Sequence, residues 1–254
     1  MTNWIGLRTL YARETRRFLK VWNQTIIAPM VTTLIFLAIL TLALGGHARD
    51  IDGVPYALFI APGLIMMAVV QNAFANTSSS LMLQKIQGVI NDILMPPLSG
   101  SEITFSLVMG GITRGVLVGL AVSAGIYVFV PFGVHDWFFL VYFILMASAM
   151  LALLGVLAGV MAQTFDHIAA LTNYLVTPLS FLSGTFYSIH QLPLWLQHVS
   201  HANPFFYMID GFRYAVTGYS DSSPWIGFWV LLATTALLWA LTQHLITKGW
   251  RLKS

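Results

Sequence analysis

The sequence contains no cysteine and few charged residues. Without cysteine, the chain has no disulfides, no thiolate catalysis and no cysteine-based metal sites. Charged residues make up 8% of the 254, whereas soluble domains carry roughly 25%. Hydrophobic residues make up 57%, and the mean hydropathy is +0.78. A water-facing surface cannot be built from this composition, so we predict an integral membrane protein.

The sequence also lacks an energy source of its own. It has no G-x-x-x-x-G-K-[ST] loop, so it cannot bind and hydrolyse ATP by that route. Among the charged residues, Arg114 alone falls well inside a predicted span, and no acidic residue is placed for proton or sodium coupling. The net charge of +3 is too small and too scattered to indicate nucleic-acid binding. No filter-like loop that would indicate a channel stands out.

No catalytic residue and no metal site is predicted. His167 lies beside Asp166 in a short turn, but no partner motif surrounds them. Three histidines cluster later in the chain with a spacing that matches no recognised ligand pattern, and no carboxylate lies among them. We therefore interpret them as polar interfacial residues rather than metal ligands: His190, His198 and His201.

Six apolar stretches are long enough to cross a bilayer, which takes about 20 helical residues. Because backbone polar groups must be satisfied inside lipid, each is predicted to be a helix. With the N-terminus in the cytoplasm, Arg49 and Arg213 fall outside, and all other lysines and arginines except Arg114 fall inside. Six crossings also return the C-terminus to the cytoplasm. The predicted spans are residues 22–44, 56–77, 105–131, 137–161, 168–187 and 225–246.

Residues 1–21 are predicted to form a basic amphipathic helix in the inner membrane surface. Its arginines and lysine surround an apolar face. Two interpretations stay open: a topology anchor, or a helix that also contacts a cytoplasmic partner. The apolar face comprises Trp4, Leu7, Tyr11, Phe18 and Trp22.

Residues 84–97 are predicted to form a second amphipathic helix, in the cytoplasmic connection between spans two and three. Its apolar positions follow helical spacing, and Pro96 and Pro97 end it. A plain connection needs only about 2–8 residues, so the helix indicates a docking surface, although it could instead rest on lipid headgroups. The surface comprises Gln84, Lys85, Ile86, Gln87, Val89, Ile90, Asn91, Asp92, Ile93 and Leu94.

The connection 188–223, predicted to lie outside, is apolar but interrupted by prolines and charges. We expect one or two short re-entrant or interfacial helices there.

Small and polar residues mark the predicted helix contacts. Glycines recur every four residues, a spacing that allows close helix approach in lipid. Amides in the second span, together with Arg114, either hold helices together or contact a transported molecule, and both roles stay open. The glycines are Gly111, Gly115, Gly119, Gly155 and Gly159, and the amides are Gln71, Asn72 and Asn76.

Several motifs together resemble the membrane permease subunits of ABC-2 type exporters over essentially the full chain. The chain looks closer to the bacterial YadH-like inner-membrane permeases than to the nodulation-factor export permeases, which it resembles more distantly. The motifs are "APGLIMM" at 61–67, "NAFAN" at 72–76, "GGITRGVLVG" at 110–119, "TFD" at 164–166, "TPLSFLSGTFYSI" at 177–189, "LP" at 192–193, "NPFFYMIDGFRY" at 203–214 and the terminal "RLKS".

The resemblance implies an all-α membrane domain that works as a dimer, which we expect to be a homodimer, with two cytoplasmic ABC ATPase subunits. ATP and Mg²⁺ would be bound by those partners, and this chain would hold no cofactor. Residues 84–97 would be the coupling helix, and the turn at Asp166 a second contact with the ATPase. The cargo would be amphipathic: a lipid, glycolipid, polysaccharide or hydrophobic drug. An outer gate would comprise Gly184, Thr185, Phe186, Tyr187, Asn203, Pro204, Phe205, Phe206 and Tyr207.

Two other functions stay open. The chain could be a channel or scaffold that works without an ATPase, or a membrane enzyme such as an acyltransferase that uses His167 or His201.

Overall fold

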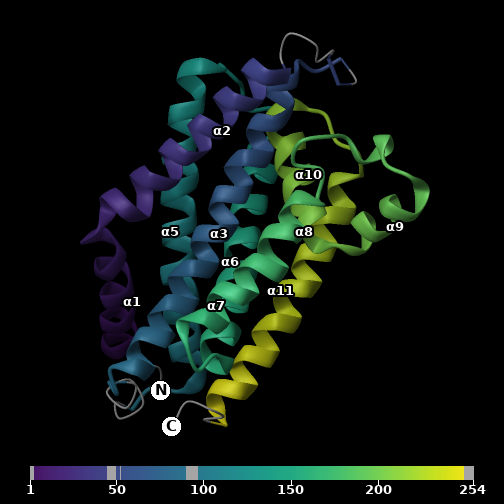
Figure 1. Ribbon diagram of the computed structural model, residues 1–254. Helices are drawn as coiled ribbons and strands as arrows, with labels where there is room; N and C mark the ends of the chain where they lie inside the picture. The colour runs from purple at the N-terminus through teal and green to yellow at the C-terminus, as the bar shows by residue number, and fades with distance from the viewer. Residues whose placement is uncertain (1–2, 45–49, 52, 90–96, 249–254) are drawn as a thin grey trace.

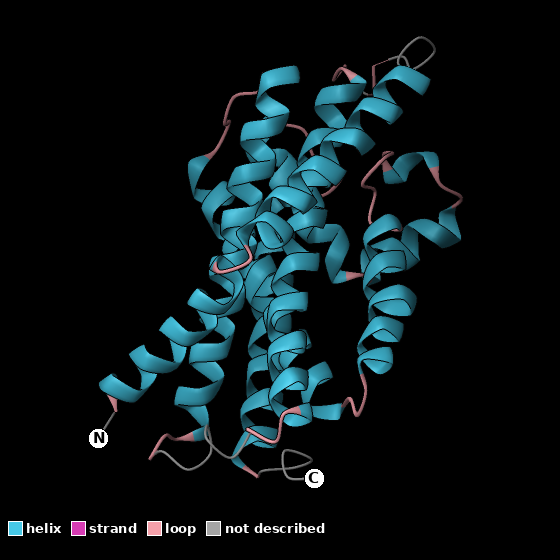
Figure 2. Cartoon of the chain, turned by 60° about the vertical axis from the view of Figure 1, so that its left-hand side comes forward, coloured by secondary structure: helices cyan, strands magenta, loops and turns pink. Residues whose placement is uncertain are grey.

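The structure, a computed structural model, describes residues 3–44, 50–51, 53–89 and 97–248. Every regular element in these ranges is a helix (Figure 2), which confirms the predicted all-α membrane fold. Five helical segments are long and apolar enough to cross a bilayer, and they form one elongated bundle (Figure 1). These segments are Asn23–Leu42, Tyr56–Ile86 (α3), Gly100–Phe129 (α5), Trp137–Met161 (α6) and Pro224–Thr247 (α11).

The other described elements are shorter, and two of them, η1 and α2, together form the first span. The first of the shorter elements, α1, is inclined to the long axis of the bundle (Figure 2). A π-helical turn, η1, joins it to α2, and a second π-helical turn, η2, lies between α7 and α8. The shorter elements are α1 (Trp4–Leu19), η1 (Asn23–Ile27), α2 (Ala28–Leu44), α7 (Phe165–Leu171), η2 (Thr172–Val176), α8 (Thr177–Phe181), η3 (Ile189–Gln191), α9 (Leu194–Ala202) and α10 (Pro204–Thr217).

The beginning of α1, the end of α3, the beginning of α5 and the end of α11 lie together at the lower end of the bundle in Figure 1. The backbone amide of Asn3 donates to Glu102 Oε1 at 2.6 Å. Gly100 packs so closely on Thr247 that a Cβ there would lie 3.2 Å from the Thr247 Cα. We call this the lower end, and the opposite end, which carries α9 and α10, the upper end.

Helices α3 and α5 differ from the predicted spans. Helix α3 has 31 residues and continues to Ile86, where the prediction ended at residue 77. Gln84–Ile86 therefore belong to α3 and not to a separate amphipathic helix, and Gly88, at φ +70°, follows the end of α3. Helix α5 has 30 residues and begins at a capping box of Ser99 and Glu102. At 1.5 Å per residue, both are about 45 Å long, longer than a bilayer core of about 30 Å. The rest of the predicted coupling helix, residues 90–96, lies outside the described residues.

The predicted fifth span, 168–187, is shorter in the structure. Its helical run joins α7, η2 and α8, of seven, five and five residues, and ends at Phe181. Two local features end it: Gly184 adopts φ +70°, and Thr185 Oγ1 donates back to the Ser180 carbonyl at 2.7 Å. Residues 182–187 are therefore a turn and not the last helical turns of a span.

Close packing of α3, α5 and α6 forms the centre of the bundle. A Cβ at Gly111 would lie 2.6 Å from the Ala152 Cβ, and one at Gly115 would lie 2.7 Å from Ser148 Oγ. Gly119 packs on Val69, and Gly159 on Leu81. Backbones at this distance gain dispersion contacts that larger residues would prevent.

Replacing Gly155 with alanine is expected to destabilise the bundle. The added Cβ would collide with Thr77 Oγ1 and the Phe74 carbonyl, both fixed to α3. Overpacking of this kind costs about 1–3 kcal/mol of the free energy of unfolding. Thermal unfolding of the purified chain in detergent measures it, with Gly133→Ala as the control because no atom lies within 4 Å of a Cβ there. Equal melting temperatures for the two variants would contradict this packing.

Candidate functional site

A buried carboxylate fastens α1 to the lower part of α3. Glu14 is 1% exposed, and its Oε2 accepts a hydrogen bond from Ser80 Oγ at 2.6 Å. Gln84 Nε2 donates to its other oxygen at 3.4 Å, and Arg13 pairs with that oxygen at 3.0 Å. Arg17 approaches the carboxylate at 3.5 Å and donates to the Asn76 carbonyl at 2.6 Å. Burial lowers the pKa of Arg17, and Glu14 opposes that shift. We call Glu14, Arg17, Asn76, Ser80 and Gln84 the Glu14 cluster.

Helix α1 also packs along the first half of α5. Ser106 Oγ donates to the Leu7 carbonyl at 3.2 Å, and Tyr11 shares a hydrogen bond with Thr113 at 2.9 Å. The buried face of α1 contains Leu10, Glu14 and Phe18, whereas the predicted face members Trp4 and Trp22 are 72% and 53% exposed. The buried face therefore includes Glu14 and excludes Trp4 and Trp22. The carboxylate of Glu14 can be buried because α3 supplies polar partners for it.

Lys85 connects α3 to the end of α6. Its Nζ donates to the carbonyls of Gly159, Val160 and Ala162 at 2.6–3.0 Å. These carbonyls lie in the last turn of α6 or just beyond it, where helix geometry leaves them without internal partners and a cation is favourable. A few residues later, Asp166 lies exposed in the first turn of α7. Lys85 therefore joins the beginning of the predicted docking segment to the part of the chain that leads into Asp166.

The predicted docking residues divide into buried and exposed groups. Gln84 is buried in the Glu14 cluster, while Ile86, Gln87 and Val89 are exposed at the tip of the lower end. Ile90, Asn91, Asp92, Ile93 and Leu94 lie outside the described residues. The exposed tip has two large apolar side chains, Ile86 at 57% and Val89 at 37% exposure, with no cover in the described chain.

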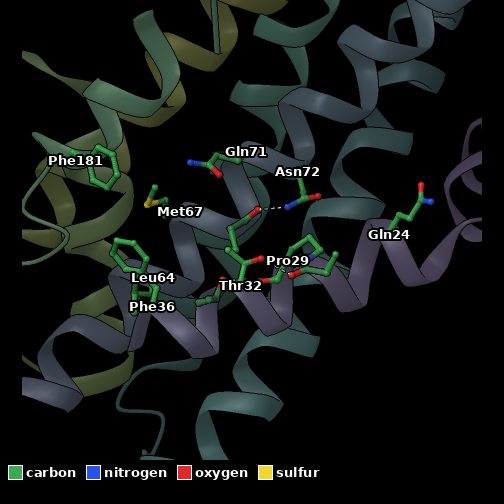
Figure 3. Close-up of a pocket in the computed structure, with 12 residues that line it drawn as sticks. Gln24, Pro29, Thr32, Phe36, Leu64, Met67, Gln71, Asn72 and Phe181 are labelled. Carbon is green, nitrogen blue, oxygen red and sulfur yellow. Dashed lines mark hydrogen bonds between the residues drawn. The ribbon is translucent and has the colours of Figure 1, made fainter. Parts of the chain in front are cut away.

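A cavity of about 400 Å³ opens between α2, α3 and α8 (Figure 3). Two of the predicted pathway residues, Gln71 and Asn72, line it, and Arg114 reaches it indirectly because its Nη2 donates to Asn72 Oδ1 at 2.8 Å. Asn76 lies one turn further along α3 and is not part of the lining. The lining is mixed, with polar Gln24, Thr32, Thr33, Gln71 and Asn72 and apolar Ala28, Pro29, Phe36, Leu64, Met67, Ala68 and Phe181.

Irregular helix flanks this cavity on two sides. The π-helical turn η1 precedes Pro29, and η2 precedes Pro178 in α8. Since π-turns insert an extra residue, they are typical of functional sites and of places where a helix bends. Both elements that line the cavity opposite α3 are therefore built on wide turns.

The upper end is held by a buried arginine. Arg213 of α10 is 0% exposed, and its guanidinium donates to the Gly184 carbonyl and lies 4.0 Å from the centre of the Phe59 ring. It pairs with Asp210 at 3.5 Å and with Asp221 at 3.9 Å. Burial raises the pKa of Asp210 to about 6, while Arg213 opposes that shift. We call these charged residues the Arg213 cluster.

The predicted outer-gate residues lie in the turn that Arg213 contacts and at the start of α10. Asn203 is buried: its amide donates to the Leu179 carbonyl at 3.0 Å, and its oxygen accepts from the Phe205 amide at the start of α10. Phe186 packs against Phe36 and Phe181, which line the cavity. The turn after α8, the start of α10 and the upper wall of the cavity are thus in contact. The remaining predicted residues lie in these same segments, with Thr185, Phe205, Phe206 and Tyr207 buried and Pro204 and Tyr187 partly exposed.

The three histidines of the upper end do not come together. His190 faces Asp221 at 4.0 Å, His198 bonds the Leu194 carbonyl, and His201 packs on Phe206.

Sequence reasoning missed Glu14 and the Arg213 cluster. Glu14 is the lone carboxylate in a basic segment, and its partners Ser80 and Gln84 are 66 and 70 residues away. Asp210 and Arg213, by contrast, are spaced i, i+3 within an apolar helix. That spacing was a usable signal, because charges in an apolar helix must be paired.

Comparison with known proteins identifies the family. The family model described as "ABC-2 type transporter" matches residues 6–217. The chain is 38% identical to "Inner membrane transport permease YadH" of Escherichia coli (strain K12), over 99% of this chain and 98% of that protein. It is 24% identical to "Nodulation protein J" of Rhizobium meliloti (strain 1021), over 85% of this chain and 82% of that protein. The predicted resemblance is confirmed, including its order.

Proposed function

Because this chain belongs to the ABC-2 type transporter family, we propose that it is the membrane permease subunit of an ATP-driven exporter in the bacterial inner membrane. A separate ATPase binds ATP and Mg²⁺ and does the hydrolysis, and this chain forms the path. Its termini are cytoplasmic, so the lower end faces the ATPase. The family match across residues 6–217 carries the proposal.

The lower end supports a mechanical role. Helices α3 and α5 extend about 15 Å beyond the length that one crossing needs. The Glu14 cluster joins α1 to α3, and Lys85 joins α3 to α6. A push on the exposed tip at Ile86 and Val89, or at Asp166, is therefore delivered to several spans at once. Such a rigid-body movement switches the path between inward- and outward-open states.

Two observations support a second copy and an amphipathic cargo. In the most apolar window of the first span, 11% of residues are buried within the chain, against 78% in α3. The first span thus has a large exposed apolar surface, which supports a homodimer in which a second permease covers this surface. The cavity beside α2 has polar and apolar lining, which suits a lipid, glycolipid, polysaccharide or hydrophobic drug.

Purification of the tagged chain from its native membrane tests this function. We expect a P-loop ATPase to co-purify in equal numbers, and we expect Ile90→Asp and Ile93→Asp, which add charge to the docking segment predicted from the sequence, to remove it. A chain that purifies without an ATPase, and that alone moves solutes across liposomes without ATP, would instead be a channel.

Filling the cavity is expected to block transport. Thr32→Trp adds a bulky indole ring to the lining of a cavity of about 400 Å³. ATP-dependent export should therefore fall by about tenfold or more. The control is Leu237→Trp, at an exposed position of α11 that lies outside both the cavity lining and the first span. Whole-cell export of a lipid, glycolipid, polysaccharide or hydrophobic drug measures the effect of each of the two substitutions. Equal export by the two variants would remove the cavity from the path.

A further inference from the structure

Two arginines from different helices meet beside α3 with too little negative charge between them. Arg17 of α1 donates to Asn76 Oδ1 at 3.0 Å, and Arg114 of α5 donates to Asn72 Oδ1 at 2.8 Å. Their two acceptors, Asn72 and Asn76, lie one helical turn apart on α3, so both cations face the same stretch of that helix. Glu14 is the one carboxylate paired with Arg17, and it also serves Arg13. Among the described residues, no carboxylate lies within 4.0 Å of Arg114.

Each of the three residues that meet at this stretch of α3 also keeps an unused hydrogen-bond donor. Arg17 Nε, Arg114 Nε and Asn76 Nδ2 are buried and make no hydrogen bond within the described chain. Arg17 Nε lies 3.5 Å from Glu14 but outside bonding geometry. All three atoms are donors, and leaving a buried donor unpaired is costly. The spot therefore needs a group with several acceptor oxygens and negative charge.

The place of these residues in the bundle indicates where that group comes from. Arg17 lies six residues before Asn23, where the first apolar span begins. This is the depth of lipid headgroups, where arginine is attracted to anionic phosphates. Arg17 is 29% exposed and Arg114 is partly exposed, so part of each arginine side chain reaches the surface.

We propose that Arg17, Arg114 and Asn76 bind one phosphate group, presented by an anionic phospholipid or as free phosphate. The guanidiniums supply charge and forked donors that match phosphate geometry, and the Asn76 amide supplies a third donor. The bound phosphate neutralises the excess charge and fixes the junction between α1, α3 and α5. The site is separate from the ATPase contact, so it can exist whether or not the proposed function is correct.

Binding by the purified chain in a neutral detergent tests the proposal. The probes are dioleoyl-phosphatidylglycerol against dioleoyl-phosphatidylcholine, read by native mass spectrometry, and sodium phosphate against sodium chloride at equal ionic strength, read by thermal shift. Selective binding of phosphatidylglycerol identifies a lipid phosphate, and selective stabilisation by sodium phosphate identifies a free one. If neither probe is preferred over its control, the proposal fails.

Three variants locate the site. Arg114→Gln should weaken binding of the preferred probe by about tenfold or more. Arg16→Gln removes an exposed charge from the same helix and should change it by less than about twofold. Asn76→Asp supplies a carboxylate in the same shape, so the chain should stay folded while binding is lost. Equal losses for Arg16→Gln and Arg114→Gln, or full binding by Asn76→Asp, would overturn the proposal. No ATPase is present, so failure here leaves the proposed function untouched.

Discussion

Replacing Arg213 with methionine is expected to lower the free energy of unfolding by about 3–5 kcal/mol. Methionine keeps the volume and the contact with Phe59, but it leaves Asp210 and Asp221 without their cation. The change also removes the charge that lowers the pKa of Asp210, so that carboxyl should become protonated. The Gly184 carbonyl loses its donor as well, which should loosen the turn after α8. Thermal unfolding and the yield of folded protein in detergent measure the loss.

Two controls separate the charge effect from a packing effect. Arg8→Met changes an exposed arginine and should be near neutral. Combining Arg213→Met with Asp210→Asn and Asp221→Asn removes the unpaired charges and should recover much of the stability, because a buried ion network can be replaced by neutral groups at little cost. If the single variant were as stable as the unmodified chain, the Arg213 cluster would have no structural role.

Replacing Lys85 with methionine is expected to uncouple the two ends of the molecule. The variant loses three hydrogen bonds from a charged donor, each contributing about 1.5–3 kcal/mol. We expect the ATPase to bind and hydrolyse ATP while the movement of the spans falls to about a tenth. Because the chain has no cysteine, a single Phe36→Cys can carry a fluorescent dye at the cavity, and its ATP-dependent signal reports the movement.

Lys248→Met, at an exposed lysine of the same lower end, is the matched control. It should leave the dye signal unchanged. A Lys85→Met complex with a full ATP-dependent signal would show that the contact between α3 and α6 does not transmit the movement.

The bounds of an apolar span could be predicted from the sequence where a residue next to the helix end sets them. Helix α6 has the predicted bounds of residues 137 and 161, because Asp136 caps its beginning with hydrogen bonds to two backbone amides. The extension of α3 could not be predicted in the same way. Its last turns carry Ser78, Ser80, Gln84 and Lys85, which resemble a loop in isolation and become helical because α1 and α6 supply their partners.

The candidate site, like the spans, could be predicted only in part from the sequence. Gln71 and Asn72 stood out as amides in an apolar span, and they line the cavity. The predicted end of the fifth span was wrong. The sequence stays apolar through residues 182–187, but Gly184 and Thr185 turn the backbone there. Glu14 could not be found, since its burial depends on a helix more than 60 residues away.

Cross-linking from single introduced cysteines tests the central claim most directly, since the unmodified chain offers no competing thiol. Val89→Cys lies at the exposed tip of the lower end and Leu194→Cys, 74% exposed in the native residue, at the upper end. In membranes that contain the complex, we expect Val89→Cys to cross-link to a P-loop ATPase, with a yield that changes when ATP is added, and Leu194→Cys to give no such product. An ATPase attached at residue 194, or none attached at residue 89, would contradict the claim that force enters this protein at its lower end.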